Sequence, residues 1–132
     1  MEGLTSRDGP RRAEWVGEPS VEAVECARGQ FQGVLRMWGL GEDVVEDAVL
    51  VVAELLANVV VHARTPFRLA VHLRRPLLRV SVSDRRVGAP AARSVNPTAG
   101  RISGLRLINA VVFRWGWQEH ETGKTVWAEL IV

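Results

Sequence analysis

Residues 50–63 read LVVAELLANVVVHA. Up to Val61, this stretch contains only two polar side chains, Glu54 and Asn58, which are four residues apart. On a helix, that spacing puts both side chains on one face, one turn apart. Burying an acid and an amide in an apolar helix is unfavourable unless each finds a partner. Two interpretations follow: a polar pair at the rim of a core helix, satisfied by backbone or water, or one wall of a functional cleft.

The sequence before and around this stretch predicts two helices. Apolar residues recur at helical spacing over residues 21–38, and Ser20 is placed to cap the first turn. A second helix is expected over residues 42–63, with an apolar surface around most of its circumference, which is typical of a helix buried on more than one side. Residues 1–19 show no sustained period. We expect them to form a flexible arm, which could include a short edge strand at Ala13–Val16.

Beyond the second helix, the apolar period changes from helical to alternating. Residues 67–73 and 78–82 predict two strands joined by a turn, and the second strand ends at Asp84. A loop of sixteen residues, 85–100, follows. Loops of this length are usually functional or disordered.

The last third of the chain predicts one more helix and a hairpin. The helix begins at Ser103 or Gly104 and runs to Val112, and strands are expected over residues 113–119 and 124–132. The complete order predicts an α+β fold. We expect a two-layer α/β sandwich in which three helices cover one face of a mostly antiparallel sheet.

Composition and charge exclude several classes of protein. The 132 residues are enough for one domain, and 47% of them are hydrophobic, too many for a disordered chain. No apolar run is long enough to cross a membrane and the N-terminal residues do not resemble a signal peptide, so a cytoplasmic protein without a membrane partner is expected. The single Cys26 fits a reducing compartment and is expected to be a small buried residue. Because 17 basic residues are balanced by 15 acidic ones, direct nucleic-acid binding is not expected.

Three common kinds of site are not supported by the sequence. Gly123, Lys124 and Thr125 resemble the end of a phosphate-binding loop, but the glycine required five residues earlier is replaced by Gln118, and a strand follows instead of a helix. We interpret these residues as a hairpin turn that enters a strand. The 3 histidines are scattered, with no cysteine pair, so no metal centre of the zinc type is predicted. No motif for a covalent nucleophile is present.

The remaining polar residues fit a nucleotide site when they are combined. A carboxylate and an amide on a helix wall can hold Mg²⁺ through oxygen and orient an attacking hydroxyl. An aspartate at a strand end, such as Asp84, can accept a hydrogen bond from an exocyclic amine like that of adenine. A glycine at a helix start lets backbone N–H groups meet phosphate, and a long loop ahead of it can close over the ligand.

Four segments in this order resemble the four boxes of the gyrase/histidine-kinase ATPase superfamily. They are ELLANVVVHA from Glu54, VSVSDRRVG from Val80, GRISGLRLI from Gly100 and GKTVW from Gly123. The subgroup most similar to this pattern is the bacterial anti-sigma-factor serine kinases, such as RsbW and SpoIIAB. The resemblance implies a Bergerat-type sandwich over residues 20–132 that binds ATP and Mg²⁺.

The resemblance also implies a role for each matching residue. Asn58 would bind Mg²⁺ and bridge it to the phosphates, and Glu54 would take the proton from a serine or threonine hydroxyl of a protein substrate. Asp84 would accept the amine of adenine. The other nucleotide contacts would come from His62, Gly88, Gly100, Arg101, Gly104, Leu105 and Thr125.

The implied function is that of an ATP-binding regulator of the anti-sigma type. It would be a protein serine/threonine kinase that acts on an anti-sigma antagonist, with a sigma factor or that antagonist as partner, and it could form a homodimer. Two departures from the family pattern motivate an alternative. Residues 85–87 lack a second glycine of the adenine box, and Ile102 stands where relatives commonly have glycine. The alternative is a catalytically weak or inactive module that sequesters a regulatory protein.

Overall fold

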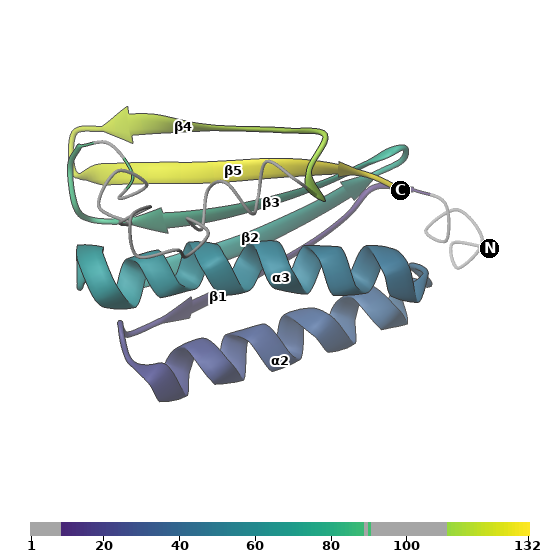
Figure 1. The fold of residues 1–132 in the computed structure, drawn as a ribbon, viewed down its shortest axis with the longest axis horizontal. Coiled ribbons are helices and arrows are strands. Elements are labelled where there is room, and N and C mark those ends of the chain that lie inside the picture. The colour runs from purple at the N-terminus through teal and green to yellow at the C-terminus, as the bar shows by residue number, and fades with distance from the viewer. Residues whose placement is uncertain (1–8, 89, 91–110) are drawn as a thin grey trace, which may run out of the picture.

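The computed structural model describes residues 9–88, 90 and 111–132. Two helices form one layer and a five-stranded sheet forms the other (Figure 1). In chain order the elements are β1 (Arg11–Gly17), α2 (Val21–Met37), α3 (Glu42–Asn58), the π-helical turn η1 (Val59–Ala63), β2 (Phe67–Arg74), β3 (Leu77–Asp84), β4 (Arg114–His120) and β5 (Gly123–Ile131).

The sheet confirms the expected α+β class. Its strand order is β1-β2-β3-β5-β4, and each neighbouring pair is antiparallel. The last strand in the chain, β5, therefore lies between β3 and β4. The register pairs Asp84 with Lys124 and Ser83 with Thr125.

The N-terminal segment is part of the sheet rather than an arm. Strand β1 pairs with β2 along its whole length. The reason is its alternation: Ala13 and Trp15 pack against the core, and the Trp15 ring meets the Phe31 ring edge-on at 6.1 Å between centroids. The edge strand expected at Ala13–Val16 is thus present and longer, and the flexible arm predicted for residues 1–19 is wrong for Arg11–Gly17.

Both helices bury the faces that their apolar spacing predicts. The Ser20 side chain caps α2 by accepting a hydrogen bond from the Ala23 backbone N–H at 3.1 Å. Helix α2 packs on α3 and β1, and α3 packs on β3 and β5. Cys26 is exposed on α2, not buried as expected, because it lies on the polar side of that helix. The third predicted helix falls largely within residues 91–110, outside the described residues.

Helix α3 does not continue regularly to Ala63. After Asn58 the chain winds into the wider turn η1, and the Arg64 backbone N–H donates to the Val59 carbonyl at 2.6 Å. Arg64 then ends the turn in the left-handed conformation, with φ of 58°. Single π-helical turns inserted into helices occur frequently at functional sites. None of the described helices is long and apolar enough to cross a bilayer.

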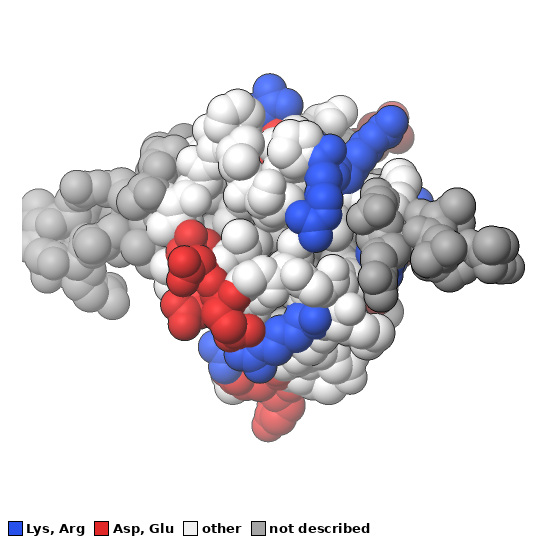
Figure 2. All heavy atoms as spheres, turned by 90° about the vertical axis from the view of Figure 1, so that its right-hand side faces the viewer, with Lys and Arg blue, Asp and Glu red and all other residues white. Residues whose placement is uncertain are grey.

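Charges of both signs lie close together at the end of the molecule where α3 begins (Figure 2). There the Arg36 guanidinium donates to both oxygens of Glu42 at 3.0 Å, linking the end of α2 to the start of α3. The hydrogen bond with Glu42 raises the pKa of Arg36 above its ordinary value. This mixed surface agrees with the nearly balanced charge of the whole chain.

Candidate functional site

Those assigned site residues that the structure describes lie at the other end of the molecule. The C-terminal turns of α3, the turn η1, the end of β3 and the start of β5 all lie at this end (Figure 1). Helix α3 contacts both β3 and β5. The fold therefore brings the polar pair of α3 to the same end as the aspartate that closes β3.

Glu54 and Asn58 provide side-chain oxygen atoms that could bind a metal ion at this end of the molecule. Both residues are half-buried on α3, and no described residue forms a hydrogen bond or an ion pair with either side chain. A carboxylate and an amide oxygen are the kind of ligand that Mg²⁺ prefers, so the donor set fits this cation. The described residues contain no group of three or more His, Cys, Asp or Glu side chains that could enclose a metal. A cation at Asn58 would therefore have to complete its shell with water and ligand oxygens.

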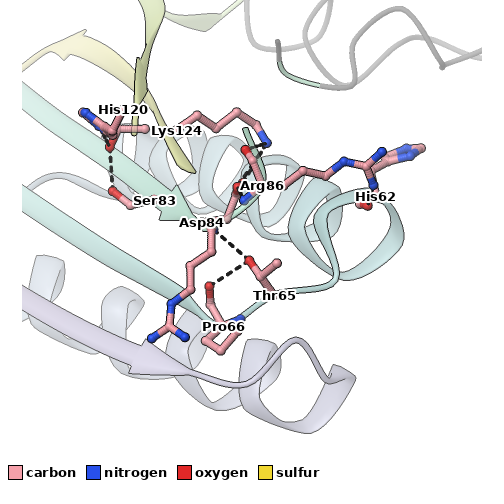
Figure 3. A network of polar contacts seen from close by, with 10 residues as sticks. His62, Thr65, Pro66, Ser83, Asp84, Arg86, His120 and Lys124 are labelled. Atoms are coloured by element: carbon pink, nitrogen blue, oxygen red, sulfur yellow. Dashed lines mark hydrogen bonds and ion pairs between the residues drawn. The ribbon is translucent and has the colours of Figure 1, made fainter. Parts of the chain in front are cut away.

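Asp84 forms a buried ion pair with Lys124, directly across the β3–β5 ladder (Figure 3). The Lys124 Nζ atom lies 3.1 Å from each carboxylate oxygen, and the two side chains are only 5% (Asp84) and 8% (Lys124) exposed. The Arg86 backbone N–H also donates to Asp84 Oδ1, at 2.8 Å, and Lys124 Nζ donates to the Arg86 carbonyl at 3.3 Å. The carboxylate that was assigned to bind the adenine base therefore already has hydrogen-bond partners within its own chain.

Gly123 allows the start of β5 to lie close to the backbone at the end of β3. A Cβ atom added at Gly123 would lie 1.9 Å from the Asp84 carbonyl oxygen and 2.7 Å from Arg85 Cα. No side chain can be accommodated there without moving the backbone. The glycine therefore fixes the position from which Lys124 reaches Asp84.

Thr125 lies on the other face of the sheet, away from the Asp84 carboxylate. Successive residues of a strand point to opposite faces, so Lys124 faces the helices and Thr125 faces outward. The Thr125 hydroxyl hydrogen-bonds with Ser83 at 2.8 Å and with His120 Nε2 at 2.9 Å. These three residues, together with Asp84, line a cavity of about 380 Å³. The assignment of Thr125 to the nucleotide site stays a prediction, and Lys124 is the residue of β5 whose side chain contacts the Asp84 carboxylate.

The other assigned residues are only partly described. Gly88 has φ of +113°, a conformation that glycine adopts readily, and no described atom lies within 4 Å of an added Cβ. His62 is half-buried at the end of η1, and its carbonyl accepts a hydrogen bond from Arg86 Nη1 at 2.6 Å (Figure 3). The residues assigned to phosphate and lid, Gly100, Arg101, Gly104 and Leu105, lie outside the described residues.

Sequence reasoning missed the contribution of Lys124 and Arg86. The signal for Lys124 was available in the alternation of β5, where Val126, Ala128 and Leu130 are buried toward the helices. Extending that alternation backward puts residue 124 on the same side. The role of Arg86 depends on its backbone N–H and carbonyl, which no sequence pattern specifies.

A second buried carboxylate, Glu129, lies on the outer face of the sheet. Its side chain is 6% exposed and is paired with Arg79 Nη1 at 2.9 Å and with Arg114 Nε at 2.5 Å. Burial alone would raise the pKa of Glu129, but the hydrogen bonds from Arg114 and Arg79 outweigh it and hold the pKa below its ordinary value. The Arg79 guanidinium also stacks 4.2 Å from the centre of the Trp127 ring.

Comparison with known proteins places this geometry in a family. Residues 18–130 match the family described as the histidine kinase-like ATPase domain. The chain belongs to this family. Membership of the histidine kinase-like ATPase domains implies nucleotide binding, and it agrees with a site built from the end of α3 and the ends of β3 and β5. A comparison with curated proteins finds no match to this chain.

Two solved structures share the fold of this histidine kinase-like ATPase domain. The structure of the RsbU and RsbW domains of Rv1364c from Mycobacterium tuberculosis aligns with a TM-score of 0.71 and 19% identity, covering 92% of this chain. This chain spans only 32% of the length of that protein chain. A chain of the SiaB–SiaC complex from Pseudomonas aeruginosa aligns with a TM-score of 0.64 and 13% identity, covering 100% of this chain and 96% of the other. At these identities, the likeness confirms the fold class alone.

Proposed function

We propose that this domain binds a nucleoside triphosphate, ATP by family resemblance, together with Mg²⁺, and regulates transcription as an anti-sigma-type protein serine/threonine kinase. One observation carries the proposal. Glu54 and Asn58 are one helical turn apart, without described partners, at the end of the molecule where β3 closes on a buried aspartate. In a histidine kinase-like ATPase domain, this pair has the chemistry for a metal ligand and a general base.

Each residue of the pair has a separate task in this proposal. Asn58 holds Mg²⁺, which when bound neutralises charge on the triphosphate. Glu54 accepts the proton of a serine or threonine hydroxyl on the protein substrate. Contacts with the nucleotide also come from His62, Gly88 and, within residues 100–105, from Gly100, Arg101, Gly104 and Leu105.

The proposed partners are proteins. One solved structure with this fold is a complex, SiaB–SiaC, and another carries the RsbU domain beside the RsbW domain. By analogy, this domain acts in the cytoplasm on an anti-sigma antagonist or a sigma factor, without direct contact with nucleic acid or membrane, and can pair with a second copy. This analogy rests on fold and not on sequence identity.

A second candidate function is a binding module without kinase activity. The observation that favours it is the Asp84–Lys124 pair, in which the carboxylate has a counter-ion within the chain itself. In that case, the domain sequesters a regulatory protein and uses nucleotide only as a conformational ligand, or not at all.

Phosphotransfer from labelled ATP to candidate antagonist proteins separates the two functions. We expect transfer by the parent protein and none by Glu54→Ala, because the base is removed. The matched control is Glu46→Ala, which removes an exposed glutamate of the same helix. Equal transfer by Glu54→Ala and the parent excludes Glu54 as the base. A Mg²⁺-dependent rise in melting temperature without transfer favours the binding module.

A further inference from the structure

We infer that the cavity at the end of the outer sheet face binds an oxyanion of the phosphate class, either free phosphate or the phosphate group of an ester. Its lining includes two arginines, one histidine and three hydroxyl groups, which belong to Arg68, Arg85, His120, Ser83, Thr122 and Thr125. The inference does not depend on nucleotide binding, because Glu54 and Asn58 belong to α3, which packs on the opposite face of the sheet.

The polar wall of the cavity is a row of side chains that crosses three strands. The antiparallel register pairs Arg68 of β2 with Ser83 of β3, and Ser83 with Thr125 of β5. Directly opposed residues project from the same face of a sheet, with Cβ atoms about 4.5–5.5 Å apart. This face points away from the helices, because the neighbouring residues Val82 and Val126 are buried in the core.

The cationic groups of the cavity are available to a ligand. The Arg85 side chain is exposed and forms no hydrogen bond or ion pair with any described residue. The Arg68 Nε atom lies 3.9 Å from Glu14 Oε1, too far for a hydrogen bond. The carboxylate among the lining residues, Asp84, is only 5% exposed and has Lys124 as its counter-ion. The uncompensated charge of the lining is therefore positive, which favours an anion.

A chain of hydrogen bonds supplies a further donor to the same ligand. The Thr125 hydroxyl lies 2.9 Å from His120 Nε2 and 2.8 Å from the Ser83 hydroxyl. A hydroxyl group has one proton to donate. When His120 Nε2 carries a proton and donates it to Thr125, the Thr125 hydroxyl donates to Ser83, and the Ser83 hydroxyl donates into the cavity. An anion beside Arg68 selects this direction, because it accepts the last hydrogen bond.

The size of the cavity and its donors fit a phosphate group better than a metal ion. Arginine has a planar fork of donors that matches the oxygen atoms of phosphate. The described residues contain no group of three or more His, Cys, Asp or Glu side chains that could hold a metal. At about 380 Å³, the cavity is within the range of small-molecule sites, about 300–1,000 Å³, so it has room for a group attached to the phosphate.

The test is an NMR titration of the whole chain with sodium phosphate, followed through the backbone amide signals and compared with sodium chloride at the same ionic strength. We expect saturable shifts confined to residues around the cavity, with a dissociation constant of roughly 1 mM or lower. Titration with phosphoserine identifies the source of the phosphate. Tighter binding of phosphoserine than of phosphate indicates an ester, and the reverse indicates the free ion. Serine is the control and should not bind.

Two pairs of variants locate the site. Arg68→Gln should weaken phosphate binding at least about tenfold, because a charge-assisted hydrogen bond is lost. Its matched control, Arg74→Gln, removes an exposed arginine from the other end of the same strand and the same face, and should bind phosphate like the parent. Thr125→Val interrupts the hydrogen-bond chain and should weaken binding about fivefold, whereas Thr125→Ser keeps the hydroxyl and should preserve it.

Three results overturn the inference. The first is that phosphate causes no larger shifts around the cavity than chloride does. The second is equal weakening by Arg68→Gln and Arg74→Gln, which would indicate a diffuse positive surface instead of a site. The third is binding of serine as tightly as phosphoserine, because the phosphate group would then not be recognised. None of these results bears on nucleotide binding, and a failure to bind ATP leaves the inference in place.

Discussion

The two sides of the candidate site are built in opposite ways. On α3, Glu54 and Asn58 are half-buried and no described residue pairs with them. On the sheet, the Asp84 carboxylate is almost fully buried and is paired with Lys124. The helix side thus has two polar groups without partners among the described residues, whereas the carboxylate on the strand side has a counter-ion within the chain. The comparison shows that the two sides differ in how their carboxylates are partnered: Glu54 has no partner among the described residues, whereas Asp84 has a buried counter-ion.

The largest expected effect is the difference in stability between two single variants, one that removes the carboxylate on the strand side and one that removes the carboxylate on the helix side. Asp84→Ala leaves the Lys124 ammonium buried without its counter-ion, so we expect the free energy of unfolding to fall by about 3–5 kcal/mol. Glu54→Ala removes a side chain that has no described partner, and we expect a change below about 1 kcal/mol. Urea denaturation of the two variants measures both values. Similar losses in the two variants would remove the contrast between the sides.

Gly123 tests whether the strand side depends on close backbone approach. In Gly123→Ala, the new Cβ would meet the Asp84 carbonyl oxygen at 1.9 Å. The start of β5 must then shift, and we expect a loss of about 1–3 kcal/mol in unfolding free energy. The helix-side control is Ala57→Ser, a small change at an exposed position of α3. Thermal unfolding compares them, and an unchanged melting temperature for Gly123→Ala would contradict the packing described.

A third carboxylate, that of Glu129 on the outer face of the sheet, is tested by the pH dependence of stability. Its pKa is held below the ordinary value of a glutamate, about 4.3, so the folded state binds the Glu129 proton more weakly than the unfolded state. The contribution of the ionised Glu129 side chain to the stability of the fold is therefore fully present above about pH 4.3, and it is lost as the pH falls through the lower pKa of the folded state. Denaturation of the parent and Glu129→Gln between neutral pH and pH 3 measures it. The variant should lose less stability on acidification, and parallel curves would contradict the assignment.

The smallest expected effect is at the end of the helix side. Arg64 adopts φ of 58°, which is unfavourable for a residue with a Cβ atom. Arg64→Gly relieves this conformation at the expense of a more flexible unfolded chain, so we expect a gain of only a few tenths of a kcal/mol, at most about 1 kcal/mol. Thermal unfolding detects it. A clear loss of stability would show that the Arg64 side chain contributes more to η1 than its weak 3.4 Å contact with the Val61 carbonyl indicates.

The sequence predicts the fold class and the helix that carries Glu54 and Asn58 well. Periodicity alone gives α2, α3 and the strand that ends at Asp84, and spacing alone puts Glu54 and Asn58 on one helix face. These features depend on local pattern, which a sequence displays directly. The assignments within residues 91–110 stay predictions, because they lie outside the described residues.

The strand side was less predictable for a physical reason. A shift of one residue along a strand moves a side chain to the opposite face, so the register decides whether Lys124 or Thr125 lies on the same face as the Asp84 side chain. The register is set by pairing with β3, which is distant in sequence. Strand β1 was missed as a full strand for the same reason, since its place depends on β2. The turn η1 interrupts a helix whose apolar pattern continues without a break.

The position of β5 between β3 and β4 also affects the order in which the site can assemble during synthesis. Asp84 leaves the ribosome 40 residues before Lys124, its partner across the ladder. Until that later segment emerges, the growing chain has an acidic strand end with no counter-ion, and contacts so distant in sequence form slowly. A nascent chain that stops short of β5 therefore has helix α3 but lacks the buried ion pair, so the strand side of the candidate site is one of the last parts of the domain to be completed.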